Sequence, residues 1–225
     1  NYLNELNKQQ IPTYLISGIF REKQLFFKWY GGFYRTALNA FTYFFVQNEK
    51  SKVLLQKLGK NNVTISGDTR FDRVGAILER DNSLAFIAHF VTNKTTVVAG
   101  STWPKDEAVL ANFINNTQQE LKFIIAPHNI KQDQIKELQQ SLRKKTVLYS
   151  DFIADPSINL EEYDVLLIDT IGILTKIYSY ADIAYVGGGF GNPGVHNILE
   201  PATFGIPIVI GPNYSHFAEA TALVN

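Results

Sequence analysis

Residues 183–211 read IAYVGGGFGNPGVHNILEPATFGIPIVIG, which is the pattern of a strand, a glycine loop, a helix and a second strand. Gly187, Gly188 and Gly189 end an apolar, β-branched run, and Asn197 with Glu200 has the Asn-x-x-Glu spacing of a helix start. Glycines let a ligand approach the backbone, and the open N–H groups of a helix's first turn favour an anion. The stretch therefore predicts a phosphate-binding loop.

The same alternation of strands and helices extends back from this loop. Short β-branched runs occupy residues 95–100, 122–127, 146–150, 164–169, 183–187 and 206–211, and helical stretches occupy 105–119, 130–143, 171–179 and 197–204. Strands separated by helices of this length pair in parallel through right-handed crossovers. We therefore predict an α/β fold with a Rossmann-like, doubly wound parallel sheet.

An earlier block of the chain has a similar pattern on a smaller scale. It opens in a helix at residues 2–9 and continues with buried strands at 11–19 and 41–48, a helix at 49–58 and another short strand at 62–67. Apolar spacing predicts a helical connector over residues 73–92. The polar connection at 151–163 is long enough for a lid or an ordered loop.

Composition narrows the possible functions. The 225 residues carry 21 basic and 21 acidic side chains, so nothing in the net charge points to nucleic acid. Cysteine is absent, which excludes disulfides, thiolate metal sites and a cysteine nucleophile. We find no signal peptide and no apolar run of about 18 residues that could span a bilayer. Methionine is also absent, even as an initiator, so we expect a piece excised from a longer protein or a sequence that has lost its methionines.

The candidate site residues follow the predicted strands, because ligands in open α/β sheets bind beyond the carboxyl ends of the strands. Small, hydroxylated and amide side chains dominate there, which suits a phosphate and a sugar and does not suit a metal. No Gly-Lys-Ser/Thr follows the glycines, and the dinucleotide fingerprint is poor. Outside the glycine loop, the candidates are Ser101, Thr102, Pro127, His128 and Asp169.

Two pairs of these candidates have a structural alternative. Glu200 either caps its helix together with Asn197 or binds the hydroxyls of a ribose. Ser101 and Thr102 either cap the helix that begins at Pro104 or contact a phosphate, and the two roles are compatible.

Single residues also have two interpretations. His128 is either an ordinary loop histidine or a ligand-binding group, and Asp169 is either a helix cap or a functional carboxylate. Arg70 either pairs with Asp68 on a surface turn or meets the negative charge of a ligand.

The stretch from Phe20 to Arg35 mixes aromatic and basic residues. Such a mixture suits the boundary between lipid headgroups and acyl chains. The alternative is a core helix with a few extended lysines, and Gly31-Gly32 argues against one straight amphipathic helix.

Several motifs together resemble the 3-deoxy-D-manno-octulosonic acid (Kdo) transferase family. They are GDTRFDRV (67–74), AGSTWPKDE (99–107), IIAPHNI (124–130), DTIG (169–172), ADIAYVGGGFG (181–191) and GVHNILEPATFGIPIVIGPNYSHFAEA (194–220). The resemblance covers nearly all of the chain in order. It implies a GT-B glycosyltransferase that moves Kdo from CMP-Kdo to a lipid A precursor, inverting the anomeric centre without a metal or cofactor.

The family's organisation implies how this chain is divided. Residues 1–75 are expected to be the C-terminal part of an acceptor domain, 76–94 a connector, and 95–225 a donor domain truncated at its end. The resemblance places the enzyme at the cytoplasmic face of the bacterial inner membrane. Membrane contact would then come from the missing N-terminal part and from residues 20–35.

The resemblance also implies roles for residues of this sequence. Glu200 is expected on the ribose, the loop 127–129 on cytosine, and Arg70 as a possible contact to the donor. The family often has Pro-Arg-His where this chain has Pro127-His128-Asn129. Its catalytic base is a glutamate that would precede residue 1, so we name no catalytic residue and expect this chain alone to be inactive. The remaining CMP-Kdo contacts are expected from Ser101, Thr102, Asp169, Gly187, Gly188, Gly189 and Asn197.

Two other classes of function remain open. One is a different GT-B enzyme, such as a UDP-sugar transferase or epimerase. The other is a nucleotide-binding or interaction module without catalytic activity.

Overall fold

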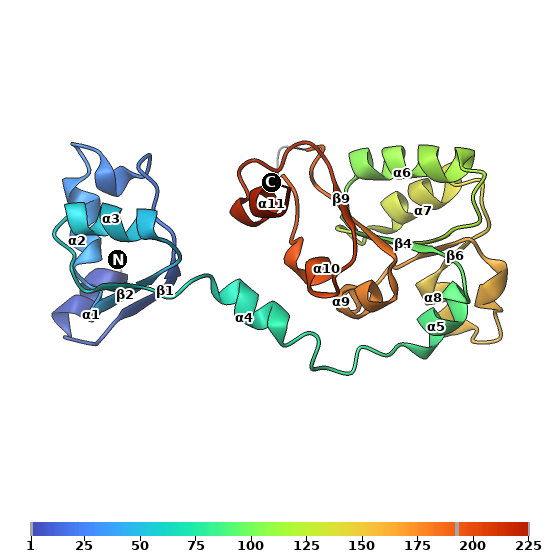
Figure 1. Ribbon diagram of the computed structural model, residues 1–225, viewed down its shortest axis with the longest axis horizontal. Coiled ribbons are helices and arrows are strands. Elements are labelled where there is room, and N and C mark those ends of the chain that lie inside the picture. The colour runs from blue at the N-terminus through green and yellow to red at the C-terminus, as the bar shows by residue number, and fades with distance from the viewer. Residues whose placement is uncertain (1, 192–193, 225) are drawn as a thin grey trace. The chain divides into compact units, whose positions relative to one another are not determined.

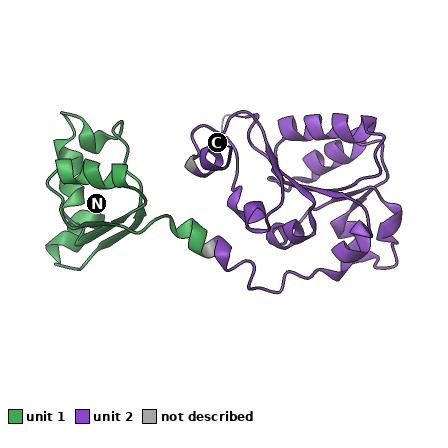
Figure 2. Ribbon diagram, in the orientation of Figure 1, with its two compact units in different colours: residues 1–73 green, residues 74–225 purple. Residues whose placement is uncertain are grey.

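The computed structural model describes residues 2–191 and 194–224 (Figure 1). Contacts between residues divide the chain into two compact units, Asn1–Arg73 and Val74–Asn225 (Figure 2). Each unit has its own parallel sheet and its own buried core, so each is described by itself.

The second unit is built on a six-stranded sheet in which every pair of neighbouring strands is parallel. The spatial order is β6-β7-β5-β4-β8-β9. The predicted doubly wound parallel sheet is therefore confirmed, with all six strands in the expected places. The strands are β4 (Thr96–Thr102), β5 (Lys122–Pro127), β6 (Thr146–Leu148), β7 (Val165–Leu167), β8 (Ile183–Val186) and β9 (Ile208–Ile210).

Helices cover both faces of this sheet (Figure 1). Phe123 and Ile125 of β5 pack with α6 (Pro104–Asn116) and α7 (Gln132–Ser141) on one face. Ile124 and Ala126 point to the other face and pack with α5, α8, α9 and η3. Because successive strand residues point to opposite faces, a strand buried on both sides is apolar throughout. The helices of the second face are α5 (Ala85–Val91), α8 (Tyr149–Ala154), α9 (Leu174–Ile177) and the 3-10 helix η3 (Tyr178–Tyr180).

The sheet changes its winding direction between β4 and β8. These two strands are neighbours, but the chain leaves β4 toward β5 on one side and leaves β8 toward β9 on the other. In an open α/β sheet, such a point opens a crevice beyond the carboxyl ends of the strands, where ligands bind. The topology therefore singles out the residues that follow β4 and β8.

The predicted helix over residues 73–92 is wrong. The structure has α4 (Thr69–Gly75) and α5, with an irregular segment between them. In that segment Asp81 accepts hydrogen bonds from the backbone N–H and the hydroxyl of Ser83, and the Asn82 side chain donates to the carbonyl of Ile77. Short polar side chains that bond to nearby backbone compete with helix formation, and here they stabilise a non-helical turn at residues 81–83, between the end of α4 and the start of α5.

The connection at 151–163 is an ordered segment and not a lid. It contains the end of α8 and the 3-10 helix η2 (Leu160–Glu162), and the Leu160 side chain is fully buried in the core. The ammonium group of Lys122 donates to the carbonyls of Glu161 and Tyr163, and it lies 4.7 Å from the centre of the Phe90 ring. These contacts fix the segment to the sheet.

The first unit has a three-stranded parallel sheet in the order β1-β2-β3. Its core contains Phe44, Val46, Leu54, Leu55 and Val63. The three strands and the two helices predicted in this block are confirmed with shorter bounds, but β1 is not a buried strand, since Tyr14 and Ile16 are exposed. The elements are α1 (Tyr2–Lys8), β1 (Tyr14–Gly18), α2 (Gly32–Leu38), β2 (Tyr43–Val46), α3 (Glu49–Lys57) and β3 (Val63–Ile65).

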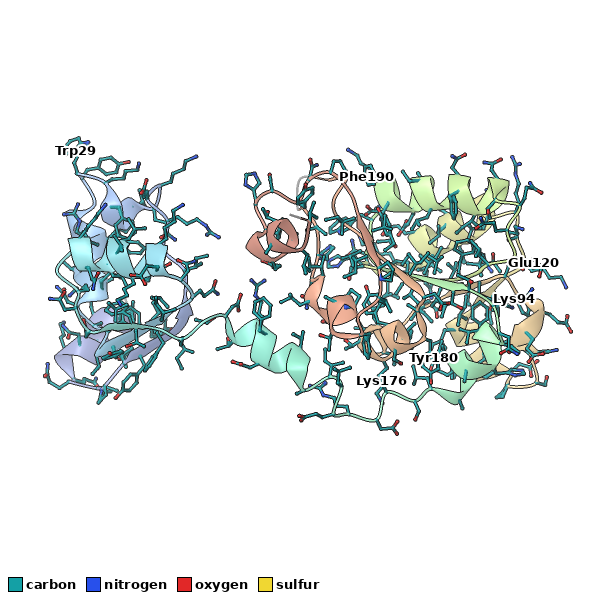
Figure 3. The ribbon with its side chains drawn as sticks, viewed as in Figure 1. Trp29, Lys94, Glu120, Lys176, Tyr180 and Phe190 are labelled. Atoms are coloured by element: carbon teal, nitrogen blue, oxygen red, sulfur yellow. The ribbon has the colours of Figure 1, made fainter. Side chains whose placement is uncertain are left out.

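Residues 20–35 do not form one helix. They contain the 3-10 helix η1 (Leu25–Phe27) and the start of α2. Phe20 is buried, and Phe26 and Phe27 pack against the core, as the core alternative predicts for that part. Trp29 (Figure 3) is 91% exposed and Phe33 is 77% exposed, so this part of the stretch lies on the surface. Within the described residues, no helix is long and apolar enough to cross a bilayer.

Candidate functional site

The end of β4 is distorted at Ser101. The pairing register of β4 with β5 shifts between Gly100 and Thr102, and Ser101 has a φ of 53°. A left-handed conformation is costly for a residue with a Cβ, and such strain concentrates at functional sites. A bulge of this kind also redirects a side chain. The Ser101 hydroxyl has no hydrogen-bond partner among the described residues, so it is free to meet a ligand.

The N-cap of α6 differs from the predicted capping residues, Ser101 and Thr102. Thr102 is only 1% exposed, and its hydroxyl donates to Oε1 of Glu107 at 3.0 Å. Burial raises the pKa of Glu107. The N-cap is Trp103, one residue later than predicted, and Pro104 occupies the first helical position as expected. The Thr102 hydroxyl therefore supports the turn from inside and is not presented to a ligand.

Asp106 connects this turn to the glycine loop. Its carboxylate is 1% exposed and accepts hydrogen bonds from the backbone N–H groups of Trp103 and Gly188, both at 2.9 Å, and from the Tyr185 hydroxyl at 2.6 Å. A buried carboxylate is tolerated only when donors satisfy it, and hydrogen bonds to a charged group are strong. Asp106 therefore binds the start of α6 to the end of β8.

The three glycines of the loop are buried and lie against backbone. A Cβ on Gly187 would lie 2.4 Å from the carbonyl oxygen of Ser101. Gly188 has a φ of 94°, a conformation that glycine adopts at little cost. Glycine is required here because neighbouring parts of the chain approach closely. A Cβ added to Gly188 or to Gly189 would likewise collide with backbone, at Gly194 and Gly211 respectively.

Two of the amides expected to face an open loop are already bonded. The Gly187 N–H donates to the carbonyl of Gly100 at 3.0 Å, and the Gly188 N–H donates to Asp106. The prediction that these groups are free for a phosphate is therefore wrong, because strand pairing and the Asp106 carboxylate use them. The glycines determine the shape of the loop.

Three aromatic rings, from the segments that follow β4, β5 and β8, lie together. The indole N–H of Trp103 donates to Nε2 of His196 at 2.6 Å. The His128 ring is stacked on both, with centroids 4.8 Å from Trp103 and 4.4 Å from His196. Burial, and then the proximity of His128, lower the pKa of His196. Sequence reasoning identified His128 but missed His196 and Trp103, although His196 directly precedes Asn197 in the glycine loop.

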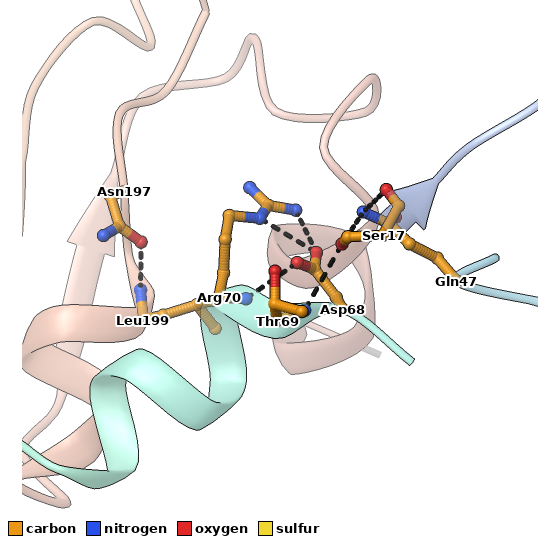
Figure 4. A network of polar contacts seen from close by, with 7 residues as sticks. All are labelled: Ser17, Gln47, Asp68, Thr69, Arg70, Asn197 and Leu199. Atoms are coloured by element: carbon orange, nitrogen blue, oxygen red, sulfur yellow. Dashed lines mark hydrogen bonds and ion pairs between the residues drawn. The ribbon is translucent and has the colours of Figure 1, made fainter. Parts of the chain in front are cut away.

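Glu200 is half-buried and bonded at both oxygens. Oε2 accepts from the Thr175 hydroxyl at 2.7 Å, and Oε1 accepts from the Asn197 side-chain amide at 3.1 Å. Asn197 Oδ1 accepts from the Leu199 N–H (Figure 4), and α10 (Leu199–Thr203) starts two residues later than predicted. The side chains of Asn197 and Glu200 are bonded to each other, but the predicted cap at Asn197 is wrong, because the N-cap of α10 is Ile198. Each carboxylate oxygen has further acceptor capacity for a ribose hydroxyl.

Asp169 follows β7 and accepts hydrogen bonds from the backbone N–H and the hydroxyl of Ser150. Its carboxylate therefore accepts from the first turn of α8, an earlier helix. The predicted cap of the next helix is wrong, because α9 begins at Leu174 with Ile173 as its N-cap and no side-chain cap. Asp169 also lines a pocket of about 450 Å³ next to the loop that follows Pro127. The other lining residues are Ile130, Gln132, Ile135, Lys136, Leu148 and Ser150.

Arg70 belongs to the first unit and pairs with Asp68, as one of the two alternatives predicts (Figure 4). The Arg70 guanidinium lowers the pKa of the Asp68 carboxyl through this hydrogen bond. Ser17, at the end of β1, accepts from the Thr69 N–H and from the Gln47 side chain. Contact of Arg70 with a ligand stays a prediction. Among residues 2–191 and 194–224, no group of three or more histidine, aspartate or glutamate side chains is placed to hold a metal ion.

Comparisons with known proteins bear on this site. Residues 1–73 match the family model of 3-deoxy-D-manno-octulosonic-acid transferase (kdotransferase). A 3-deoxy-D-manno-octulosonic acid transferase from Chlamydophila psittaci is 30% identical over 175 residues, which are 76% of this chain and 39% of that protein. The chain thus spans well under two thirds of this relative.

Two solved structures resemble the chain. The C-terminal CMP-Kdo binding domain of WaaA from Acinetobacter baumannii is 25% identical, with a TM-score of 0.50, and covers 68% of this chain and 75% of that domain. A UDP-N-acetylglucosamine 2-epimerase from Listeria monocytogenes is 10% identical, with a TM-score of 0.55, over 92% of this chain and 52% of that protein. This second similarity concerns only the fold. The chain is therefore related to the Kdo transferases, the glycosyltransferase family that its sequence motifs resemble.

Proposed function

We propose that the second unit binds CMP-Kdo, and that the protein transfers Kdo from it to a lipid A precursor in lipopolysaccharide biosynthesis. One observation carries this proposal. Polar groups that follow β4, β5 and β8 converge at the switch point of a parallel sheet, in a chain that resembles a CMP-Kdo binding domain.

The phosphate of the donor is proposed to lie at the end of β4. The unpartnered Ser101 hydroxyl is close in sequence to the first turn of α6, a helix of 13 residues whose N-terminus is the positive end of its dipole. The exposed edge of the His128 ring is near, because the His128 N–H donates to the carbonyl of Thr102 at 2.8 Å. Such fixed donors stabilise the charge that develops on the leaving CMP phosphate.

The nucleoside is proposed to lie along the next strand ends. Glu200 would accept hydrogen bonds from the ribose hydroxyls, supported by Thr175 and Asn197. The cytosine would lie against the loop 127–129 and the neighbouring 450 Å³ pocket, where Ile130 and Leu148 supply apolar walls and Asp169 a polar edge.

The transfer is proposed to invert the anomeric centre. A carboxylate base takes a proton from the acceptor hydroxyl, the oxygen attacks the anomeric carbon, and the bond to CMP breaks. We assign no described side chain to the role of base and expect it from a segment that precedes residue 1 in a longer protein. We therefore expect the 225-residue chain to bind the donor and not to transfer Kdo by itself.

The first unit is proposed to belong to the acceptor side, at the cytoplasmic face of the inner membrane. Trp29 and Tyr30 form an edge-to-face pair at 5.5 Å, and Phe33 and Tyr34 form another at 5.7 Å. All four side chains are exposed. Arg35 donates to the carbonyls of Phe26 and Lys28 and so orders the loop that carries them. Exposed aromatic rings beside basic residues suit the headgroup region of a bilayer.

Calorimetric titration of the chain with CMP, UDP and GDP tests the donor proposal. We expect CMP to bind at least about tenfold more tightly than the other two, a difference of about 1.4 kcal/mol. Tighter binding of UDP would indicate a UDP-sugar enzyme, and no binding of any nucleotide would indicate an interaction module. Transfer is tested with a fusion in which the N-terminal segment of a curated relative precedes residue 1. Absence of Kdo transfer by a folded, CMP-binding fusion would refute the enzymatic part.

A further inference from the structure

Trp103 and His196 form a hydrogen-bonded aromatic pair at the switch point of the sheet. Their ring planes differ by 4°, and the indole Nε1–H to Nε2 distance is 2.6 Å. The two rings are therefore parallel, with centroids 6.1 Å apart. The His128 ring is stacked on both, at 18° to Trp103 and 22° to His196.

The direction of this hydrogen bond determines the protonation of His196. An indole N–H is a donor only, so Nε2 of His196 must be the acceptor and carries no proton. The single proton of the neutral ring is therefore on Nδ1. This nitrogen has no hydrogen-bond partner among the described residues. His196 thus has one nitrogen occupied by Trp103 and a second that is an unused N–H donor.

The surrounding structure holds Trp103 in place. Its backbone N–H is bonded to the buried Asp106 carboxylate, which also holds Gly188 and Tyr185. The His196 backbone N–H donates to the carbonyl of Gly187 at 3.0 Å. The titratable groups that act on the His196 ring are His128 from the loop after β5 and Asp106 from α6. The backbones of Trp103 and His196 are therefore both held by hydrogen bonds. A hydrogen bond to one imidazole nitrogen, such as the one from Trp103, controls which of the two nitrogens is protonated.

We propose that Trp103 is a positioning residue that holds His196 as the neutral Nδ1–H tautomer, so that this N–H is a hydrogen-bond donor for the phosphate of the bound cytidine nucleotide. This inference rests on the proposed binding of CMP-Kdo. It assigns to Trp103 a role that a phenylalanine of similar shape cannot fill, because phenylalanine lacks the N–H.

The tautomer is measured directly by nitrogen NMR of the chain labelled with ¹⁵N-histidine, at a pH where the imidazoles are neutral. The His196 signals are assigned with His196→Gln, and His89→Gln serves as the control because His89 is exposed and paired with Glu161. We expect a protonated Nδ1 in the wild type, a loss of this single tautomer in Trp103→Phe, and its return in Trp103→His, whose ring again offers an N–H donor.

Binding of CMP and of cytidine separates positioning from general structural damage. In Trp103→Phe the affinity for CMP should fall about tenfold, as expected for one hydrogen bond to a charged group, and the affinity for cytidine should not change. Trp103→His should restore CMP binding to within about threefold of the wild type. His89→Gln should leave both affinities unchanged.

Several results would overturn the inference. One is a His196 tautomer that is the same in the wild type and in a folded Trp103→Phe variant, and another is an equal loss of CMP and cytidine binding. If the wild type binds no CMP but the tautomer depends on Trp103, the proposed function is refuted and the control of His196 by Trp103 stands. If CMP binds normally in all variants, the phosphate role is refuted and the proposed function stands.

Discussion

Asp106 accepts a hydrogen bond from the backbone N–H of Gly188, a residue 82 positions later in the chain, at 2.9 Å. The same carboxylate accepts from Trp103 and Tyr185, so a single buried charge joins α6 to the loop after β8. Asp106→Ala would leave these donors without an acceptor inside the protein. We expect the free energy of unfolding to fall by about 3 kcal/mol or more, measured by urea titration.

Asp133 provides the control for this change. It is exposed in the first turn of α7, so Asp133→Ala removes only a favourable interaction with the helix dipole. The expected loss is about 0.3–1 kcal/mol. Similar losses for the two variants would show that the Asp106 carboxylate does not join the two segments.

Gly187→Ala should destabilise the second unit. The new Cβ would lie 2.4 Å from the Ser101 carbonyl oxygen and 2.7 Å from the Thr102 Cα, and backbone atoms cannot move away easily. We expect a loss of about 1–3 kcal/mol in thermal or urea unfolding, the usual range for overpacking. Gly75→Ala is the matched control, since nothing lies within 4 Å of its added Cβ and its φ is not in the left-handed region. An equally stable Gly187→Ala protein would contradict the close packing of the loop.

Glu200→Gln and Glu200→Ala should weaken CMP binding about 10- to 100-fold, because a hydrogen bond to a charged group contributes about 1.5–3 kcal/mol. Calorimetry with CMP measures the change. Thr175→Val removes the support of Glu200 without removing its carboxylate and should have a smaller effect. Glu120→Ala, at a side chain 85% exposed, should have none. Unchanged CMP affinity in both Glu200 variants would exclude this residue from the ribose site.

Stability should depend on pH through His196. Burial lowers the pKa of His196 in the folded protein below its ordinary value of 6.5. The unfolded chain then binds more protons near that pH, so the free energy of unfolding rises with pH. As the pH falls from 7.5, stability should decline below about 6.5 and level off once the folded protein is also protonated. His196→Gln should have a smaller pH slope than the wild type in urea unfolding. Equal slopes in the two proteins would be the contrary result.

The exposed aromatic surface of the first unit should bind lipid vesicles. We expect Trp29→Ser and Phe33→Ser each to reduce co-sedimentation with vesicles that contain phosphatidylglycerol, because each removes apolar area that a bilayer could bury. Tyr2→Ser changes an aromatic residue that is also 91% exposed but lies on α1, outside this surface. If Tyr2→Ser weakens binding as much as Trp29→Ser, the surface has no particular role at the membrane.

Local patterns predicted most of the architecture. The six strands of the second sheet are short β-branched runs, and their spacing by helices determined a parallel, doubly wound sheet. The predictions failed where short polar side chains acted on the backbone. The expected helix over 73–92 is not continuous, since Asp81 and Asn82 bond to neighbouring groups in a non-helical turn before α5, and α10 starts late because Asn197 bonds to Leu199 and Glu200.

The site was predicted in part. Ligand contact by Glu200, which the Asn-x-x-Glu spacing singled out, stays a prediction. The strand-end rule proposed Ser101, His128 and Asp169 as further contacts, since the carboxyl ends of parallel strands share one edge. It missed His196, Trp103 and Asp106, whose partners are 79 to 93 residues away in the chain. A signal for Asp106 was present, because an acidic residue three positions after an N-cap is a common capping pattern.

The amino-acid sequence alone determined the fold class, the order of the strands along the chain and the family resemblance, because these depend on residue patterns within a few turns or strands. Tertiary structure decided which groups at the site are free. The Gly187 and Gly188 amides are used by strand pairing and by Asp106, whereas the Ser101 hydroxyl and His196 Nδ1 are left without partners among the described residues. Hydrogen bonds between distant segments depend on how the sheet and its helices pack, and local sequence patterns do not determine that packing.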